Sequence, residues 1–129
     1  MNISHNMVGW FEIPVTDMER AIAFYEAVLE IKLEHMKFPT VDMAMFPAIE
    51  NSIGAAGALS FNKQHYKPSA DGILIYFTAF SGDLSVELGR VEKAGGKILM
   101  PKMQISPEVG YMGLILDTEG NRIAFHSRS

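Results

Sequence analysis

Two side chains able to transfer protons lie in strand-like segments near opposite ends of the chain. Glu12 belongs to VGWFEIPV (8–15), and His126 lies in the closing stretch DTEGNRIAFHS (117–127). A carboxylate beside an imidazole in a cavity forms an acid–base pair that can pass a proton to and from a substrate. Whether these two groups meet depends on the fold that carries them.

The closing stretch predicts a tight turn followed by a short strand. Along that strand Ile123 and Phe125 share one face, and both are apolar as a core requires. The opposite face carries Arg122, Ala124 and His126. This second set faces either bulk water or a cavity in which His126 has a role.

Composition narrows the classes of partner. The chain has 129 residues, 48% of them hydrophobic, a net charge of -4 and no cysteine. Such a chain is expected to be one globular domain, without the basic surface that nucleic acid requires and without disulfides or thiolate metal sites. No segment matches a signal peptide or a membrane span of roughly 20 apolar residues, so we expect a cytoplasmic protein with no membrane partner.

The order of elements is predicted to repeat. In the first half we expect a helix capped by Asp17 and strands at 8–15, 31–38, 41–46 and 57–61, followed by a polar connection at 62–71. In the second half we expect a helix over 84–96 capped by Asp83 and strands at 72–80, 97–100, 111–117 and 122–127. Between these strands, PKMQISPEVG (101–110) contains two prolines and is predicted to be a rigid lid loop flanked by Gln104 and Tyr111.

The spacing indicates duplication. Asp17 precedes Leu33, and Asp83 precedes Leu99, by the same number of positions. The fold is therefore predicted to be α+β, with two βαβββ modules at about 8–61 and 72–127. A helix covers one face of each sheet, so we expect the two uncovered faces to curl toward each other and line a cup.

The nine methionines of the chain have two interpretations. Methionine is a flexible filler of irregular cores, and this is the reading that we favour. The alternative is a cavity or interface that adapts to its ligand, lined by methionines of the middle segments. These are Met36, Met43, Met45, Met100 and Met103.

Several segments resemble the vicinal oxygen chelate superfamily, the glyoxalase/bleomycin resistance/dioxygenase group, and its subgroup similar to lactoylglutathione lyase. They are FEIPVTDMERAIAFYEAVL, VEKAGGKIL, and GYMGLILDTEGNRIAFHS with the preceding PKMQIS. The resemblance runs from about Val8 to the C-terminus. It implies paired βαβββ modules forming a cup, usually in a homodimer, and in many members a divalent metal that polarises the substrate.

The metal ligands that this resemblance implies are not present at the matching positions. Val15 and Asp17 set a register in which Trp10 replaces the first ligand. The closing motif places Ala124 where the family has a carboxylate, and the two other positions fall near Tyr76 and Ala58. Tryptophan and alanine do not coordinate metals, so we expect no metal site of the family type. Lactoylglutathione lyase and extradiol dioxygenase activities, which need that metal, are correspondingly disfavoured.

Other groups remain on the predicted cup face. Glu12 and His126 each lie two residues beyond a replaced ligand position, as a candidate acid–base pair or as two ligands of a displaced metal. The alternative is that Glu12 pairs with Arg122 or a backbone donor and that His126 is solvated. Trp10 and Tyr76 either bind a flat organic ligand or pack in the core. Gln104, Tyr111 and Arg122 complete the predicted ligand-binding residues.

The sequence thus predicts a homodimer that binds a small organic molecule in the cup without a metal cofactor, either to sequester it or with modest acid–base chemistry. A divalent-metal-dependent lyase, isomerase or dioxygenase with relocated ligands is the rival hypothesis, so catalysis stays open. A third hypothesis is an accessory binding domain without chemistry.

Overall fold

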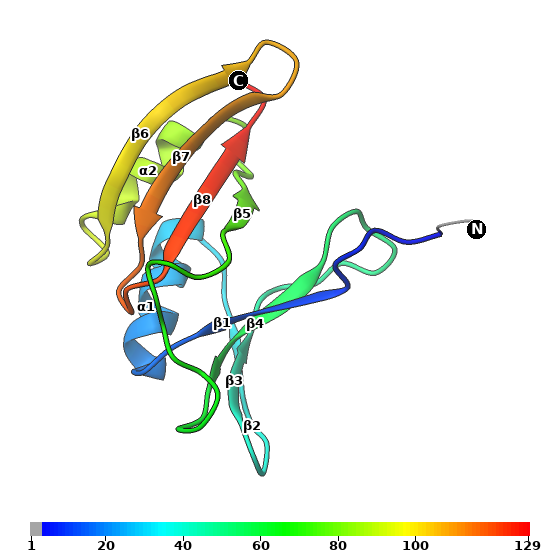
Figure 1. Ribbon diagram of the computed structural model, residues 1–129, viewed down its shortest axis with the longest axis vertical. Coiled ribbons are helices and arrows are strands. Elements are labelled where there is room, and N and C mark those ends of the chain that lie inside the picture. The colour runs from blue at the N-terminus through cyan, green and yellow to red at the C-terminus, as the bar shows by residue number, and fades with distance from the viewer. Residues whose placement is uncertain (1–3) are drawn as a thin grey trace.

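The computed structural model describes residues 4–129 (Figure 1). Each half of the chain has the predicted order of elements, β-α-β-β-β. The first half contains β1 (Trp10–Pro14), α1 (Met18–Leu29), β2 (Glu34–Lys37), β3 (Asp42–Met45) and β4 (Ala56–Phe61). The second half contains β5 (Ile75–Thr78), α2 (Leu84–Val91), β6 (Lys97–Ser106), β7 (Gly110–Leu116) and β8 (Arg122–Ser127). The prediction of an α+β fold is confirmed.

Each half forms one four-stranded mixed sheet. The strand order is β1-β4-β3-β2 in the N-terminal sheet and β5-β8-β7-β6 in the C-terminal sheet. The pairs β1–β4 and β5–β8 are parallel, whereas the remaining neighbours are antiparallel. Helix α1 packs on β3 and β4, α2 packs on β6, β7 and β8, and the two helices pack on each other. None of the helices within residues 4–129 is long and apolar enough to cross a membrane.

Both helices begin where the sequence predicts. The Asp17 carboxylate accepts a hydrogen bond from the Arg20 backbone N–H at 3.1 Å, and the Asp83 carboxylate accepts one from Ser85 N–H at 3.0 Å. These caps satisfy N–H groups that have no partner within the helix. Helix α2 is shorter than predicted, because it ends at Val91 and the chain then turns through Gly95, whose φ is 104°.

The predicted lid over 101–110 is wrong. Strand β6 continues to Ser106 and pairs with β7, so only a short turn separates the two strands. Pro101 is accommodated because β6 is the edge of the sheet and its register with β7 shifts between Met100 and Met103. A proline lacks an N–H donor, and edge strands and bulges are the places in a sheet that tolerate this loss.

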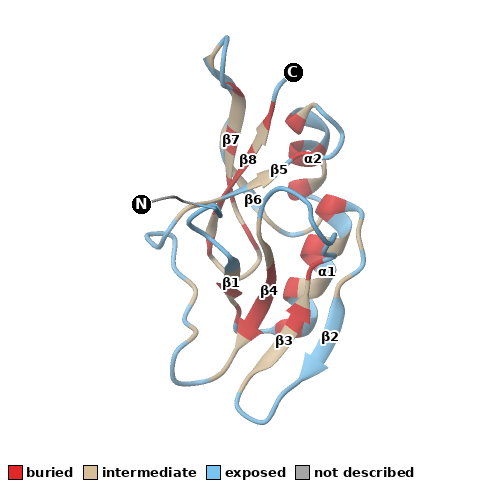
Figure 2. Ribbon diagram, turned by 90° about the vertical axis from the view of Figure 1, so that its right-hand side faces the viewer, coloured by how far each residue is buried: buried red, intermediate tan, exposed pale blue. Residues whose placement is uncertain are grey.

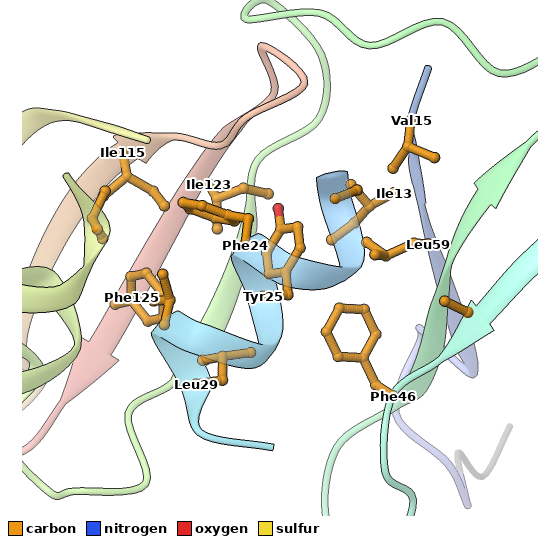
Figure 3. Close-up of a cluster of buried hydrophobic side chains, with 14 of the residues drawn as sticks. Ile13, Val15, Phe24, Tyr25, Leu29, Phe46, Leu59, Ile115, Ile123 and Phe125 are labelled. Carbon is orange, nitrogen blue, oxygen red and sulfur yellow. The ribbon is translucent and has the colours of Figure 1, made fainter. Parts of the chain in front are cut away.

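Helix α1 lies between the two sheets, and the sheet faces that turn toward each other are the ones that carry the core (Figure 3). Phe77 of β5 contacts both Phe11 of β1 and Phe46, with ring centroids 5.8 and 5.4 Å apart. Tyr25 and Phe24 of α1 are fully buried in the same cluster. One hydrophobic core therefore unites both halves.

The sequence predicts a cup between the uncovered faces of the two sheets, but within one chain these faces do not turn toward each other. The faces that meet within one chain are helix-bearing, so the other face of each sheet lies on the outside of the chain. We call these outer surfaces the open faces. Burial follows the same division: the inward sides of α1 and α2 are buried, whereas β2 is exposed along its whole length (Figure 2).

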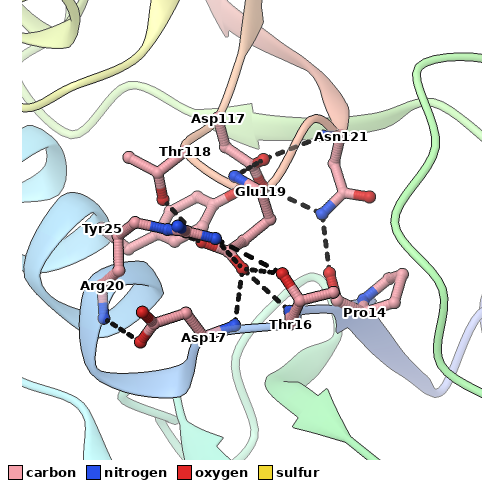
Figure 4. A network of polar contacts seen from close by, with 9 residues as sticks. All are labelled: Pro14, Thr16, Asp17, Arg20, Tyr25, Asp117, Thr118, Glu119 and Asn121. Carbon is pink, nitrogen blue, oxygen red and sulfur yellow. Dashed lines mark hydrogen bonds and ion pairs between the residues drawn. The ribbon is translucent and has the colours of Figure 1, made fainter. Parts of the chain in front are cut away.

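A carboxylate from the β7–β8 turn joins the two halves at the start of α1 (Figure 4). Glu119 Oε1 accepts hydrogen bonds from the backbone N–H groups of Thr16 and Asp17, both at 2.8 Å, and Arg20 Nε donates to Oε2 at 2.7 Å. The amino end of a helix favours a negative charge. Enclosure opposes ionisation of Glu119, but these hydrogen bonds outweigh it and lower the pKa of its carboxyl group to about 2.

Asp117 and Asn121 of the same turn extend this connection into the core. The buried Tyr25 hydroxyl donates to Asp117 Oδ2 at 2.5 Å, and Asn121 Nδ2 donates to the Pro14 carbonyl oxygen at 2.8 Å. Burial, and then the nearby Asp117 carboxylate, raise the pKa of Tyr25 well above its ordinary value, so the phenol keeps its proton. We call these contacts of Asp117, Glu119 and Asn121 with the first half the inter-module clamp.

The clamp predicts a specific pH dependence of stability. Because folding lowers the pKa of Glu119 from 4.5 to about 2, its stabilisation is fully present above pH 4.5 and is lost as the pH falls through this range toward 2. Allowing for solvent screening through the half-exposed Arg20, Glu119→Gln should lower the free energy of unfolding at pH 7 by on the order of 1–2 kcal/mol.

Urea unfolding of the wild type and the variant at several pH values between 3 and 7 measures this effect. The difference between them should shrink as the pH falls. Glu50→Gln removes the same charge from an exposed turn and serves as the control. A difference that is constant with pH would contradict the assignment to Glu119.

Candidate functional site

The open face of the N-terminal sheet is apolar and acidic. Residues paired across strands share a face, and Phe11, Ile13 and Leu59 belong to the core. The alternate positions therefore form the open face, namely Trp10, Glu12, Pro14, Glu34, Met36, Met43, Met45, Ala56, Ala58 and Ser60. This set contains two carboxylates and no lysine or arginine.

The open face of the C-terminal sheet is also rich in apolar side chains. Ile123, Phe125 and Ile115 belong to the core, which leaves the alternate positions outside. These are Tyr76, Thr78, Lys97, Met100, Met103, Met112, Leu114, Leu116, Arg122, Ala124 and His126. The predicted alternation of Arg122, Ala124 and His126 onto one face agrees with this register. All five methionines that the adaptable-lining hypothesis named lie on the two open faces.

Glu12 is held by two aromatic side chains. Trp10 Nε1 donates to Glu12 Oε2 at 3.2 Å, and the Tyr66 hydroxyl donates to Oε1 at 2.5 Å. Hydrogen bonding to Glu12, with some burial, raises the pKa of Tyr66, so the phenol is a donor at neutral pH. The expected alternative partners of Glu12, Arg122 or a backbone donor, are thus replaced by two side chains from β1 and the 62–74 connection.

His126 lies at the end of β8, where its ring binds the backbone. Its Nε2 is 2.6 Å from the carbonyl oxygen of Val109, in the turn between β6 and β7. Within residues 4–129 no hydrogen bond or ion pair joins His126 to Glu12. The two groups lie on different open faces, so one chain does not bring them together.

Tyr76 and Arg122 are positioned on the open face of the C-terminal sheet. The Tyr76 hydroxyl is 3.6 Å from Met112 Sδ, and the residue is 48% exposed, as Trp10 is at 43%. Neither aromatic side chain is therefore part of the core. Arg122 donates to the carbonyl oxygen of Gly72 at 3.1 Å, which ties β8 to the connection between the modules.

Gln104 and Tyr111 lie on the opposite face from the other predicted ligand-binding residues. They pair with each other across β6 and β7, and Tyr111 packs against the core cluster on the side of α2. Lys102 Nζ lies 4.6 Å above the centre of the Tyr111 ring and 2.8 Å from Asp83 Oδ1. Their prediction as binding residues depended on the lid at 101–110, which is a strand.

The positions that correspond to family metal ligands hold side chains without ligand atoms on the central strands. Ala58 of β4 and Ala124 of β8 are both 0% exposed, yet both lie outside the core cluster, as expected for small residues between larger neighbours on an open face. Trp10 uses its only donor on Glu12. The residues at these positions do not fit a divalent ion, whose ligands must supply oxygen, nitrogen or sulfur atoms.

The sequence places the fourth of these ligand positions near Tyr76, and the strand register moves it two residues earlier. Val15 N–H donates to the Ser60 carbonyl oxygen, and Ala79 N–H donates to that of His126. In this alignment of the two halves Tyr76 corresponds to Glu12, because Glu12 pairs with Ala58 and Tyr76 pairs with Ala124. Leu74 rather than Tyr76 is thus the counterpart of Trp10. Ser81 and Gly82 are the two additional residues before α2 that shift the register.

Sequence reasoning missed Tyr66. It lies in the polar stretch that was interpreted as a connection between modules, and its contact with Glu12 spans 54 positions. A lone tyrosine among polar residues was the available signal. Met112 was also not singled out, although its alternation with Leu114 and Leu116 indicates the face on which it lies.

Comparison with known proteins gives consistent matches over nearly the whole chain. Residues 7–125 match the family described as Glyoxalase/Bleomycin resistance protein/Dioxygenase superfamily. A protein of Didymella fabae, described as a glyoxylase-like domain-containing protein, is 30% identical over 129 residues, which cover 98% of this chain and 97% of that protein.

Solved structures share the fold at low sequence identity. A glyoxalase/bleomycin resistance protein from Albidiferax ferrireducens has a TM-score of 0.70 at 18% identity, covering 96% of this chain and 100% of its own. The antibiotic-binding protein TnmS3 from a Streptomyces species has a TM-score of 0.67 at 20% identity, covering 99% and 100%. Glyoxalase I from Zea mays has a TM-score of 0.67 at 20% identity, covering 92% of this chain but 45% of that protein, so the chain spans about half its length.

Proposed function

We propose that this chain, which belongs to the glyoxalase/bleomycin resistance protein/dioxygenase superfamily, binds a small organic molecule. The binding site is a cup formed by two copies of the chain. In this dimer the open face of the N-terminal sheet of one copy lies opposite the open face of the C-terminal sheet of the other. The observation that carries the proposal is the pair of uncovered, methionine- and aromatic-rich open faces, which point away from the shared core.

The dimer is supported by the chemistry of the two faces. Trp10, Tyr76 and Met103 are each more than 40% exposed in one chain, although they lie in regular strands. Contiguous apolar surface of this kind marks interaction sites. The faces also differ in charge, since one carries Glu12 and Glu34 and the other Lys97 and Arg122, which favours opposing them in two copies rather than like with like.

The nature of the ligand follows from the lining. Aromatic rings and methionines supply apolar contact area that adapts to shape, and a few polar groups fix the orientation of the ligand. The antibiotic-binding protein TnmS3, which has the same fold, is a precedent for small-molecule binding by this architecture. We propose a cytoplasmic protein that needs no metal for this binding, because the ligand positions of the family hold alanine and tryptophan.

Ligand binding should appear as thermal stabilisation. A ligand present at 100 times its Kd stabilises the folded state by about 2.7 kcal/mol, so a screen of aromatic and glycopeptide-like compounds should contain some that raise the unfolding temperature by several degrees. The same compounds should act weakly on Trp10→Ala and Tyr76→Ala. Gln104→Ala, on the other face of the sheet, should respond as the wild type. A screen without any stabilising compound would count against the cup.

Relocated metal chemistry is the second candidate function. Glu12 and His126 have side chains that coordinate divalent ions, and in the proposed dimer they lie on faces that oppose each other. Within residues 4–129 of one chain, no group of three or more potential ligands is close enough to hold an ion. The same pair would serve as acid and base if no metal is bound.

Metal analysis of untagged protein separates the two candidates. We expect nickel, zinc, iron and manganese each at well below one ion per chain, and no change in Glu12→Ala or His126→Ala. One ion per chain or per cup in the wild type, lost in both variants, would establish the second candidate and refute the metal-free proposal.

A further inference from the structure

We propose that Glu12, together with Trp10 and Tyr66, binds a positively charged ammonium group of the ligand. This inference rests on the proposed function, because it assigns a ligand class to the same open face. It is carried by the contacts around Glu12 and by the absence of an ion pair to it in the part of the chain that the structure describes.

The Glu12 carboxylate is oriented but not saturated. Trp10 Nε1 occupies one site on Oε2, and the Tyr66 hydroxyl occupies one on Oε1. An ionised carboxylate offers about four acceptor sites, so about two remain for a ligand. Both donors are neutral, and the negative charge of the carboxylate is therefore oriented without being compensated.

Glu87 and Asp117 also bind neutral donors, but both are buried within the chain. Other acidic groups have a partner that carries, or can carry, a positive charge. Glu119 binds Arg20, Asp83 binds Lys102, and Asp42 contacts His35. Within residues 4–129 no ion pair involves Glu12, which is only partly exposed. The open face around it adds Glu34 and has no lysine or arginine. A cation on the ligand is the group that this local charge attracts most strongly.

The surroundings suit an organic ammonium better than a hydrated metal ion. The hydrogen bonds hold the two aromatic side chains beside the carboxylate, where they supply apolar contact area to an organic cation. In the neighbouring strands, Glu12 pairs with Ala58, and Ala58 pairs with Met45. Met45 offers apolar contact to the carbon skeleton of an amine.

The partner copy supplies a competing explanation, because its open face brings Lys97, Arg122 and His126. In each chain Arg122 already binds the Gly72 carbonyl oxygen, and His126 binds that of Val109. Arg122 and His126 are thus held by their own backbone, whereas Lys97 is exposed on the edge strand. If one of them nevertheless neutralises Glu12, a charged ligand gains nothing from the carboxylate, and the experiment below detects this.

Three aromatic probes of similar size and different charge test the proposal on the wild-type protein. They are phenethylamine, which is cationic at pH 7, the neutral 2-phenylethanol and the anionic 3-phenylpropanoate. Trp10 is the sole tryptophan of the chain, so its fluorescence reports binding at the site itself. The amine should bind at least about tenfold more tightly than the alcohol, since hydrogen bonds to charged groups are the stronger ones, and the anion more weakly than either.

Three variants locate the effect. Glu12→Gln should weaken amine binding about tenfold and alcohol binding less than about twofold, whereas Glu34→Gln, which removes the same charge from the edge strand of the same face, should change amine binding less than about twofold. Tyr66→Phe should weaken amine binding without preventing folding. Melting curves verify that each variant is folded.

Amine and alcohol that bind equally, or amine binding that Glu12→Gln leaves unchanged, would overturn the ammonium site. The cup itself would then still stand, because neutral aromatic ligands would bind and depend on Trp10 and Tyr76. Failure of all three probes, together with an empty thermal-shift screen, would refute both proposals.

Discussion

The carboxylate of Glu119 at the amino end of α1 is the contact on which the arrangement of the two halves depends. Backbone donors of Thr16 and Asp17 and the side chain of Arg20 converge on it, so the β7–β8 turn of one half holds the first helix of the other. Asp117 and Asn121 extend the clamp to Tyr25 and Pro14. The DTEGN turn is therefore more than a connection between two strands. It positions α1 between the sheets, and this position decides which face of each sheet is covered.

The exposure of the open faces follows from the position of α1. With α1 between the sheets, the core faces meet, as the contact between Phe11 and Phe77 shows. The open faces then lie outside, where methionines, Trp10 and Tyr76 are uncovered. A single chain thus presents two separate open faces rather than one enclosed site. We infer that a second copy completes them, and that the ligand is held between an acidic face and the face that carries His126.

Much of the fold follows from local signals in the sequence. Asp17 and Asp83 cap their helices because a carboxylate at that position binds free N–H groups, and alternation assigned Arg122 and His126 to one face of β8 correctly. The lid at 101–110 was wrong because prolines suggested a loop, whereas Pro101 lies at an irregularity of an edge strand. Alternation shows which residues share a face, but not which face turns toward the other half. The contact between Tyr66 and Glu12 was missed for a similar reason, since it depends on the path of a connection rather than on a local pattern.

Complementation between two defective chains tests the shared cup most directly. Trp10→Ala damages only the N-terminal open face, and Tyr76→Ala damages only the C-terminal one. When the two variants are refolded together, a mixed dimer contains one cup with both defects and one intact cup, so about a quarter of all cups should regain wild-type affinity in calorimetric titration with an aromatic ligand. Recovery of this fraction is the result that our account predicts. A mixture that binds no better than the two variants measured separately would contradict it, because the site would then lie within one chain.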